Sequence, residues 1–99
     1  MPRAVLPPNM YVSYRFSGKL TGWIEYFVDS TATVNVYAVD AAGLRQFKAG
    51  SQEFDCYDAS PGKKKHEGRF KPRNAADWFL IVQNNSRSVE AYIQYEVFS

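Results

Sequence analysis

The strongest constraint on the fold is the alternation of apolar and polar side chains along short stretches of the chain. Residues 89–97 read VEAYIQYEV, so every second side chain from Val89 onward is apolar and most of those between are polar. Residues 10–17, MYVSYRFS, follow the same rule. Because successive side chains of a β-strand point to opposite faces, this period of two predicts strands with one buried face.

Other segments carry related strand signals. Residues 32–39 are rich in β-branched side chains, which favour strands, and the continuous apolar run WFLIV is typical of a strand buried on both faces. Turns are expected at Asp29–Thr31 and at residues 40–43, where Gly43 would supply a positive φ. Residues 59–69 are expected to form a loop. The further predicted strands are 20–28, 32–39, 44–50, 52–58 and 78–82.

These signals predict an all-β fold, an antiparallel, jelly-roll-like β-sandwich of seven to eight strands. No helix is expected, because Gly43 interrupts the only window with helical periodicity. The last two strands are expected to pair as a hairpin around residues 84–88, with the final strand half exposed at an edge and protected by Glu90 and Glu96. Residues 1–9, which contain three prolines, are expected to be a tail or an edge segment, and residues 10–99 a single domain.

Composition indicates the cellular compartment in which such a domain would be found. The 99 residues include one cysteine, Cys56, so no intrachain disulfide can form, which favours a reducing compartment. No apolar run approaches the roughly 20 residues that a membrane-spanning helix needs, and the start of the chain lacks the apolar region of a signal peptide. The expected location is cytoplasmic, with the chain acting alone or as a domain of a larger protein.

Positive charge is concentrated in one segment. Residues 63–73, KKKHEGRFKPR, carry six positive charges and one negative charge, a net charge of +5. The remaining residues carry six positive and nine negative charges, a net charge of −3, and the whole chain has a net charge of +2. The excess positive charge therefore lies in about a tenth of the chain.

This basic segment is a candidate contact for a nucleotide or another small anion, because clustered lysines and arginines attract phosphate. An aromatic ring within it, together with Tyr57, could stack on a base. The negatively charged remainder argues against nucleic acid as the partner. The competing interpretation is a solvated loop whose lysines oppose aggregation. The candidate anion-binding residues are Lys63, Lys64, Lys65, Arg69, Phe70, Lys71 and Arg73.

A set of aromatic residues alternates with the side chains expected in the core, and it comprises Tyr11, Trp23, Phe27, Tyr37 and Tyr92. Exposed together, such side chains would form an apolar patch of the kind that marks an interface. We expect Trp23, Tyr37 and Tyr92 to contact a protein partner or a second copy of the chain. The competing interpretation is that these rings pack within the second sheet of the sandwich.

Catalytic and metal-binding signals are weak. His66 and Cys56 could form a base–nucleophile pair, but the position of Cys56 between Phe54 and Tyr57 favours a buried thiol. One histidine and one cysteine fall short of a four-ligand metal site. The carboxylates of Glu53, Asp55 and Asp58 lack the spacing of a calcium loop. The sequence therefore predicts a non-catalytic protein with no cofactor and no metal.

The pattern of the carboxy-terminal strands resembles that of GOLD-type and pre-peptidase carboxy-terminal domains. There, an aromatic-apolar strand, an asparagine-serine turn and an alternating strand follow one another, as in Trp78–Val82, Asn84–Ser86 and Val89–Val97 here. Residues 34–47 resemble the midsection of these domains. A second resemblance is to small bacterial all-β domains of unknown function with a closing W-x-x-x-V strand.

Both resemblances imply a small β-sandwich, and the first implies interaction with proteins or lipids. The Golgi proteins that carry a GOLD domain also have a transmembrane helix, which this sequence lacks. We transfer no functional residues from either group, since one fold hosts many functions. The predicted function is a binding or assembly module that mediates protein–protein interaction, including interaction between copies of the chain. The alternative is a small-anion or nucleotide-binding module.

Overall fold

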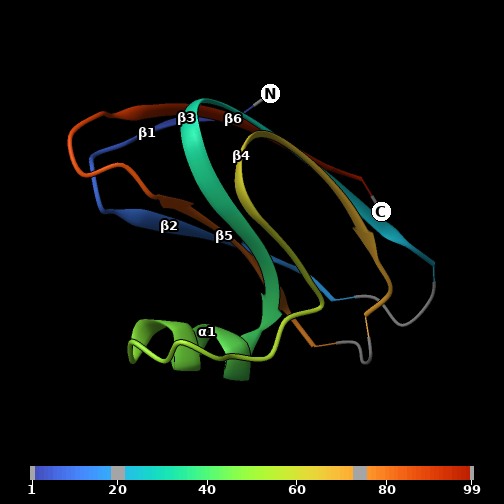
Figure 1. Cartoon of the computed structure of the whole chain (residues 1–99). Helices are drawn as coiled ribbons and strands as arrows, with labels where there is room; N and C mark the ends of the chain where they lie inside the picture. The colour runs from blue at the N-terminus through green and yellow to red at the C-terminus, as the bar shows by residue number, and fades with distance from the viewer. Residues whose placement is uncertain (1, 19–21, 73–75, 99) are drawn as a thin grey trace.

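The computed structural model describes residues 2–18, 22–72 and 76–98, which contain six β-strands and one α-helix. All six strands belong to one antiparallel sheet of order β1-β6-β3-β5-β2, with β4 paired to β3 (Figure 1). The predicted antiparallel, strand-rich fold is confirmed, but the described residues form six strands, not seven to eight. The elements are β1 (Arg3–Leu6), β2 (Tyr11–Phe16), β3 (Ile24–Asp40), α1 (Ala41–Lys48), β4 (Asp58–Phe70), β5 (Trp78–Asn84) and β6 (Ala91–Phe98).

The long strand β3 organises the sheet. Its residues 25–30 pair with β6 and its residues 34–40 pair with β5, while β4 runs along the opposite edge. The pairing with β4 shifts register between Asp29 and Val34. The turn predicted at Asp29–Thr31 is therefore wrong, because the chain bends there without leaving the sheet. Ser30 helps to shape the bend by accepting a hydrogen bond from the backbone N–H of Ala32 at 3.2 Å.

The bend divides the sheet into two arms that face each other as a curled half-barrel (Figure 1). The first arm consists of β1, β6, the start of β3 and the end of β4. The second arm consists of β2, β5, the end of β3 and the start of β4. The rings of Tyr14 on β2 and Tyr95 on β6 lie 4.2 Å apart between their centroids, although these strands are not neighbours in the sheet. The core therefore fills the space between the arms.

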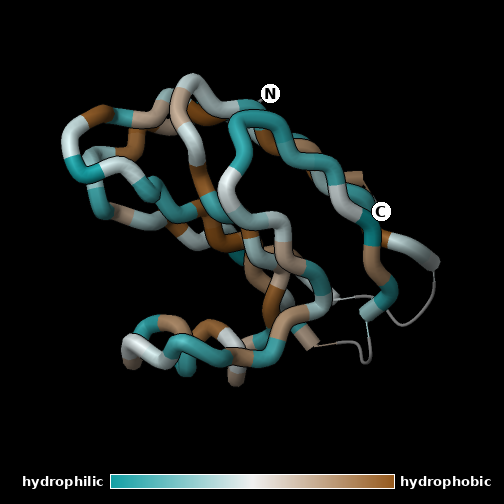
Figure 2. The backbone as a smooth tube through the Cα atoms, in the orientation of Figure 1, coloured by the Kyte–Doolittle hydropathy of each residue, from teal (hydrophilic) through white to brown (hydrophobic). Residues whose placement is uncertain are grey.

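Side chains from both arms form this core. Tyr26 on the first arm and Leu80 on the second are fully buried, and Trp78 is 1% exposed. The ring of Trp78 stacks on Phe16 at 4.6 Å and meets the ring of Phe70 at 5.0 Å. The hydropathy colours show the apolar stretches of β3 and β5 running through the middle of the molecule (Figure 2). Burial of each such side chain contributes roughly 1.5–3 kcal/mol to stability.

The helix α1 occupies residues that were predicted to be a turn and a strand. Asp40 caps its N-terminus by accepting a hydrogen bond from the backbone N–H of Gly43 at 2.7 Å. Gly43 is required for its size, because a Cβ there would collide with the backbone oxygen of Asp55. Gly43 suggested a turn, but it is needed because the helix here lies very close to the backbone of Asp55. Within the described residues, no helix has the length and apolar character needed to span a membrane.

The predicted loop at residues 59–69 is also wrong, because this segment forms most of β4. Its backbone pairs with β3 in stretches separated by two register shifts, one between Asp29 and Val34 and one between Val34 and Val36. Gly68 lies opposite Tyr26 in this pairing, and the ring of Tyr26 occupies the space that a Cβ at position 68 would need. Pairing with a buried strand thus overrides the loop-like composition of the segment.

The last two strands have nearly the predicted bounds but different partners. β5 and β6 each pair with β3, and no pairing joins them to each other in the described part of the chain. The predicted hairpin is therefore wrong, and so is the predicted edge position, since β6 lies between β1 and β3. The predicted inner face of β6 is correct for Ala91 and Ile93, which are buried.

Asn84, the last residue of β5, joins the ends of the two arms. Its side-chain amide donates hydrogen bonds to the backbone oxygens of Leu6 at 3.1 Å, Pro7 at 3.3 Å and Val89 at 2.9 Å. Its side-chain oxygen accepts a bond from the N–H of Ser86 at 2.9 Å. This side chain, 1% exposed, therefore links the β1–β2 connection to the β5–β6 connection.

Candidate binding surface

The outer surfaces of the two arms differ in what covers them. α1 packs on the outer surface of the second arm, whereas no described element covers that of the first arm (Figure 1). We call the uncovered surface the open face; it comprises the outer side chains of β1, β6, residues 23–29 and residues 65–69. Its largest apolar side chains are Val5, Trp23, Phe27, Tyr92 and Phe98.

The apolar side chains of the open face are well exposed. Trp23 is 52% exposed, Tyr92 is 57% exposed, and Val5 and Phe98 are each 51% exposed. Phe27 is partly buried, and its ring meets that of Phe98 edge-on with centroids 5.8 Å apart. Exposed apolar side chains gathered on one face are typical of an interaction surface.

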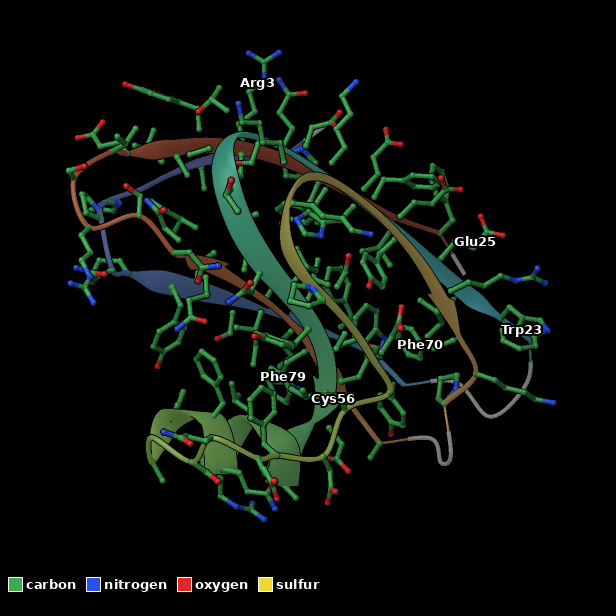
Figure 3. All side chains as sticks on the ribbon, in the orientation of Figure 1. Arg3, Trp23, Glu25, Cys56, Phe70 and Phe79 are labelled. Carbon is green, nitrogen blue, oxygen red and sulfur yellow. The ribbon has the colours of Figure 1, made fainter. Side chains whose placement is uncertain are left out.

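Trp23 lies at one end of the open face and is oriented by its neighbours (Figure 3). The guanidinium carbon of Arg69 sits 4.6 Å from the centre of the indole ring, a cation–π contact. The Nε atom of Arg69 also lies 3.9 Å from a carboxylate oxygen of Glu25. Both charged side chains are exposed, so their contribution to stability is small. Arg69 thus contacts the indole of Trp23 and the carboxylate of Glu25 together.

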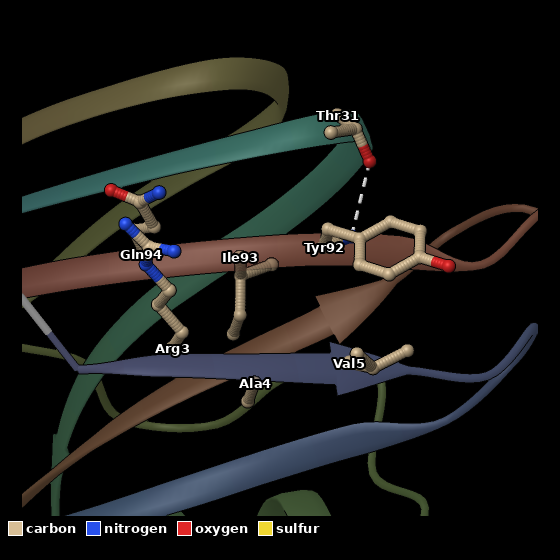
Figure 4. Close-up of a pocket in the computed structure, with 7 residues that line it drawn as sticks. All are labelled: Arg3, Ala4, Val5, Thr31, Tyr92, Ile93 and Gln94. Carbon is tan, nitrogen blue, oxygen red and sulfur yellow. Dashed lines mark hydrogen bonds between the residues drawn. The ribbon is translucent and has the colours of Figure 1, made fainter.

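Tyr92 lies near the other end of the open face, beside a hollow of about 340 Å³ (Figure 4). The backbone N–H of Tyr92 donates to Oγ1 of Thr31 at 3.0 Å, and its hydroxyl donates to Glu90 at 3.3 Å. The hollow combines an exposed ring with several polar groups. Its lining residues are Arg3, Ala4, Val5, Thr31, Tyr92, Ile93 and Gln94.

Two further hollows continue from this one across the open face. A hollow of about 290 Å³ shares Tyr92 and Gln94 with the first and adds Asp29 and Lys65. Another of about 260 Å³ shares Asp29 and Lys65 with the second and extends to Phe27. Small-molecule sites are usually deep and enclosed. A run of shallow hollows across a sheet is better suited to the surface of a protein partner.

The structure brings Trp23 and Tyr92 onto one face but places Tyr37 elsewhere. The ring of Tyr37 packs under α1, with centroids 5.0 Å from Phe54 and 6.1 Å from Phe47. Tyr11 also contacts Phe47, at 4.9 Å. For Tyr37 the alternative interpretation, internal packing, describes the environment better, although α1 and not a second sheet supplies it. Tyr11 is covered only in part and remains 39% exposed.

Residues 63–72, the described part of the basic segment, do not form one cluster of free cations around an aromatic ring. Lys63, Lys64, Lys65 and Lys71 are exposed, and Arg69 is held by Trp23 and Glu25. Arg73 lies outside the described residues. Phe70 is 4% exposed and stacks on Tyr57 with centroids 5.2 Å apart. The structure therefore assigns Phe70 and Tyr57 to packing and not to stacking on a base.

His66 is 3% exposed and lies in β4 at the bend, within the segment that was predicted to be a loop. Nε2 lies 2.7 Å from the backbone oxygen of Lys63, and Nδ1 lies 2.8 Å from Oγ of Ser60. The carbonyl can only accept, so Nε2 carries the proton and Nδ1 accepts from the hydroxyl in the neutral ring. Burial lowers the pKa of His66 below its ordinary value of 6.5. The ring therefore acts as a neutral brace within β4.

The other candidate chemical groups also have structural partners. Cys56 lies under α1 beside Phe54, and burial raises the pKa of its thiol. Asp58 accepts a hydrogen bond from the hydroxyl of Tyr26 at 2.9 Å, and burial, followed by this bond, raises the pKa of that tyrosine. Across residues 2–18, 22–72 and 76–98, no three His, Cys, Asp or Glu side chains gather as a metal site.

Sequence reasoning missed Val5 and Phe98 as members of the open face. Phe98 continues the outward series that begins at Tyr92, so the alternation of β6 could have identified it. Val5 was missed because the prolines around it suggested a tail or an edge segment without an outward face; residues 3–6 form β1, a strand at the edge of the sheet. Asn84 was also missed, because an asparagine in a polar stretch is ordinarily a turn residue.

Comparison with known proteins does not assign this surface a role. A scan against protein-family models found no match, and a search of the curated proteins found none either. The residues of the open face must therefore be interpreted from their own chemistry.

Proposed function

We propose that this chain is a non-catalytic, sandwich-like binding module that recognises another protein through the open face. The observation that carries the proposal is the exposure of Trp23, Tyr92 and Phe98 on a surface that nothing in the described chain covers. Aromatic residues are enriched at the centres of protein interfaces, where they supply most of the binding energy.

The charges around these rings favour a protein partner with a mixed surface. Arg3, Lys65 and Arg69 are interspersed with Asp29 and Glu67 on the same face. A membrane surface or a nucleic acid would be expected to select a predominantly basic face. Interspersed charges instead suit a polar rim around an aromatic centre.

Photo-crosslinking in the cells that make the protein tests this proposal. A photoreactive phenylalanine replaces Tyr92, and in a matched control it replaces Val89, which is 54% exposed but lies in the connection between β5 and β6. We expect a discrete protein adduct from position 92 that is absent from position 89 and is lost when Trp23→Ser is added. An adduct to the chain itself would identify self-association through this face.

Two results would contradict the proposal. One is the same set of adducts from positions 92 and 89, which would mean contact without recognition. The other is an adduct from position 92 that persists unchanged with Trp23→Ser and Phe98→Ser, which would remove the aromatic residues from the interface.

An anion-binding role is the second candidate, and the exposure of Lys63, Lys64 and Lys65 on β4 supports it. With Phe70 buried, the contact would be electrostatic and strongly dependent on salt. Calorimetric titration with ATP at low and high salt tests it, with Lys63→Ala and Lys64→Ala together as the variant and Lys48→Ala on α1 as the control. Absence of binding at low salt, or binding that is equal in the variant, would exclude it.

A further inference from the structure

Three strands of the sheet have an edge without a strand partner in the described residues, and two of these edges are protected. β1 has only four residues and lies between Pro2 and Pro7. β4 presents Lys63, Lys64 and Lys65 and contains the register shifts. Short strands, prolines, lysines and bulges are the devices that prevent edge-to-edge pairing.

The third edge, on β2, lacks these devices. β2 has six residues, YVSYRF, with no proline, no lysine and no register shift in its pairing with β5. Its one charged side chain is that of Arg15, near the end of the strand. The Nε atom of Arg15 forms a salt bridge with a carboxylate oxygen of Asp77 at 2.7 Å. An edge of this length and composition is competent to accept another strand.

The hydrogen bonds identify which backbone groups face outward. The N–H of Asn84 donates to the oxygen of Met10 at 2.9 Å, and Tyr11 lies opposite Gln83. In an antiparallel pair the hydrogen-bonded positions alternate, so Val12, Tyr14 and Phe16 bond to β5. The N–H and C=O groups of Tyr11, Ser13 and Arg15 therefore point away from β5, toward the edge of β2 that pairs with no other strand of the described chain.

We propose that two copies of this chain pair through β2, antiparallel and centred on Ser13. In this register Ser13 lies opposite Ser13 of the second copy, and Tyr11 lies opposite Arg15 of the second copy. Each facing pair exchanges two backbone hydrogen bonds, so all the outward groups of Tyr11, Ser13 and Arg15 are satisfied. The two curled sheets become one continuous sheet across a two-fold axis.

The side chains explain why the occupant is a second copy. Arg15 is 74% exposed in its side chain and Tyr11 is 39% exposed, and both lie on the outer side of the strand. Because they stand at equal distances from Ser13, a two-fold axis sets each guanidinium beside a tyrosine ring, where cation–π attraction is favourable. On the inner side, Val12 of each copy lies opposite Tyr14 of the other. The strand is therefore complementary to itself, as a two-fold interface requires.

Disulfide trapping tests the register directly. Ser13→Cys is made with Cys56→Ala, so that the new thiol is the only one. Directly opposed residues in a hydrogen-bonded pair have Cα atoms about 5.5 Å apart, within the range that a disulfide spans. We expect rapid, nearly complete formation of a covalent dimer on mild oxidation. Ser88→Cys in the same background, at an exposed site away from β2, is the matched control and should remain mostly monomeric.

A non-covalent measurement complements the trapping. Ser13→Pro removes an N–H that β5 does not use, so the fold should tolerate it as edge strands do, whereas Ser13→Ala keeps the N–H. We expect light scattering to show a concentration-dependent dimer for the wild type and for Ser13→Ala, and a monomer for Ser13→Pro. A wild type that is monomeric at every concentration, or equal cross-linking at positions 13 and 88, would overturn the proposal.

This inference is independent of the open face. Variants Trp23→Ser and Tyr92→Ser should leave the cross-linking at position 13 unchanged, while Ser13→Pro should leave the adduct from position 92 unchanged unless that adduct is to the chain itself. Failure of one interface can therefore be recognised without reference to the other.

Discussion

The outer surfaces of both arms carry large apolar side chains, but those of the second arm are covered and those of the first arm are exposed. On the second arm, Tyr37, Phe79 and Ile81 point outward from the strands and are covered by Leu44 and Phe47 of α1. On the first arm, Trp23 and Tyr92 point outward in the same way and remain exposed. Strand alternation thus decides which side chains point outward, but a separate segment decides whether they are buried.

The contrast between the two arms shows how an interface can be recognised in a β-rich chain. An outward aromatic residue that the chain's own helix covers contributes to stability. One that no described segment covers is available to a partner. Four substitutions or changes of condition test this distinction, and the expected effects decrease in the order given.

The largest loss of stability is expected from substitution of Asn84, because its side chain links the connections at the ends of the two arms. Asn84→Asp removes the donors to Leu6, Pro7 and Val89 and puts a buried carboxylate beside their oxygens. We expect a loss of about 3–5 kcal/mol in the free energy of unfolding, measured by urea denaturation. Asn85→Asp is the control, at an exposed position where the amide exchanges hydrogen bonds with Asn35 at 2.8 Å. It should cost about 1 kcal/mol or less, because only the exposed bond that Asn85 donates is lost. Equal losses would show that the buried amide is unimportant.

The covered surface should respond strongly to truncation. Leu44 is 8% exposed and packs with Val39 and Ile81 beneath α1. Leu44→Ala should lower the free energy of unfolding by about 2–4 kcal/mol, since it leaves a cavity between helix and sheet. Arg45→Ala, on the same helix, should cost less than about 0.5 kcal/mol. A small loss from Leu44→Ala would mean that α1 does not cover the second arm in solution.

The bend between the arms should make stability depend on pH through His66. Because the folded protein lowers the pKa of this ring, the unfolded chain binds the proton more readily. Stability should be greatest above the ordinary pKa of 6.5 and should fall as the pH is lowered below it. Thermal melting between about pH 8 and pH 5 measures the effect. His66→Gln should melt at a lower temperature at neutral pH and lose less on acidification, and an equal loss would assign the pH dependence to other groups.

The smallest effect on stability is expected on the open face. Trp23→Ser and Tyr92→Ser should each change the free energy of unfolding by less than about 0.5–1 kcal/mol, because both side chains are half exposed or more. Fluorescence offers a second readout, since Trp78 is buried and Trp23 is exposed. Acrylamide should quench the emission of Trp23 strongly in the wild type. A large loss of stability or a protected Trp23 would show that the first arm is covered after all.

Much of the strand arrangement was predictable because alternation is a local signal. The bounds of β2 and the buried face of β6 followed directly from it. The long strand β3 was divided in two, because polar residues at a bend look like residues at a turn. α1 was missed because Gly43 was interpreted through its backbone freedom, whereas the structure needs its small size.

The candidate site was predicted in part for the same reason. Trp23 and Tyr92 were identified as outward residues by alternation, and both lie on the open face. Tyr37 was grouped with them, because nothing local distinguishes an outward residue that a helix covers from one that stays exposed. Phe70 was assigned to an anion site from its neighbours in sequence, but it lies on the inward side of β4 and is buried. Which residues share a surface depends on long-range pairing that no local pattern reports.

The pairing of β1 with β6 joins residues 3–6 to residues 91–94, nearly the whole length of the chain apart. During synthesis on the ribosome, β1 is made long before β6, and until β6 emerges the backbone of β1 lacks the partner with which it pairs in the folded sheet. Sheets closed by such distant contacts form slowly and expose unpaired strands while they wait. Because proline cannot donate to a ladder, Pro2 and Pro7 limit the pairing open to this segment during that interval.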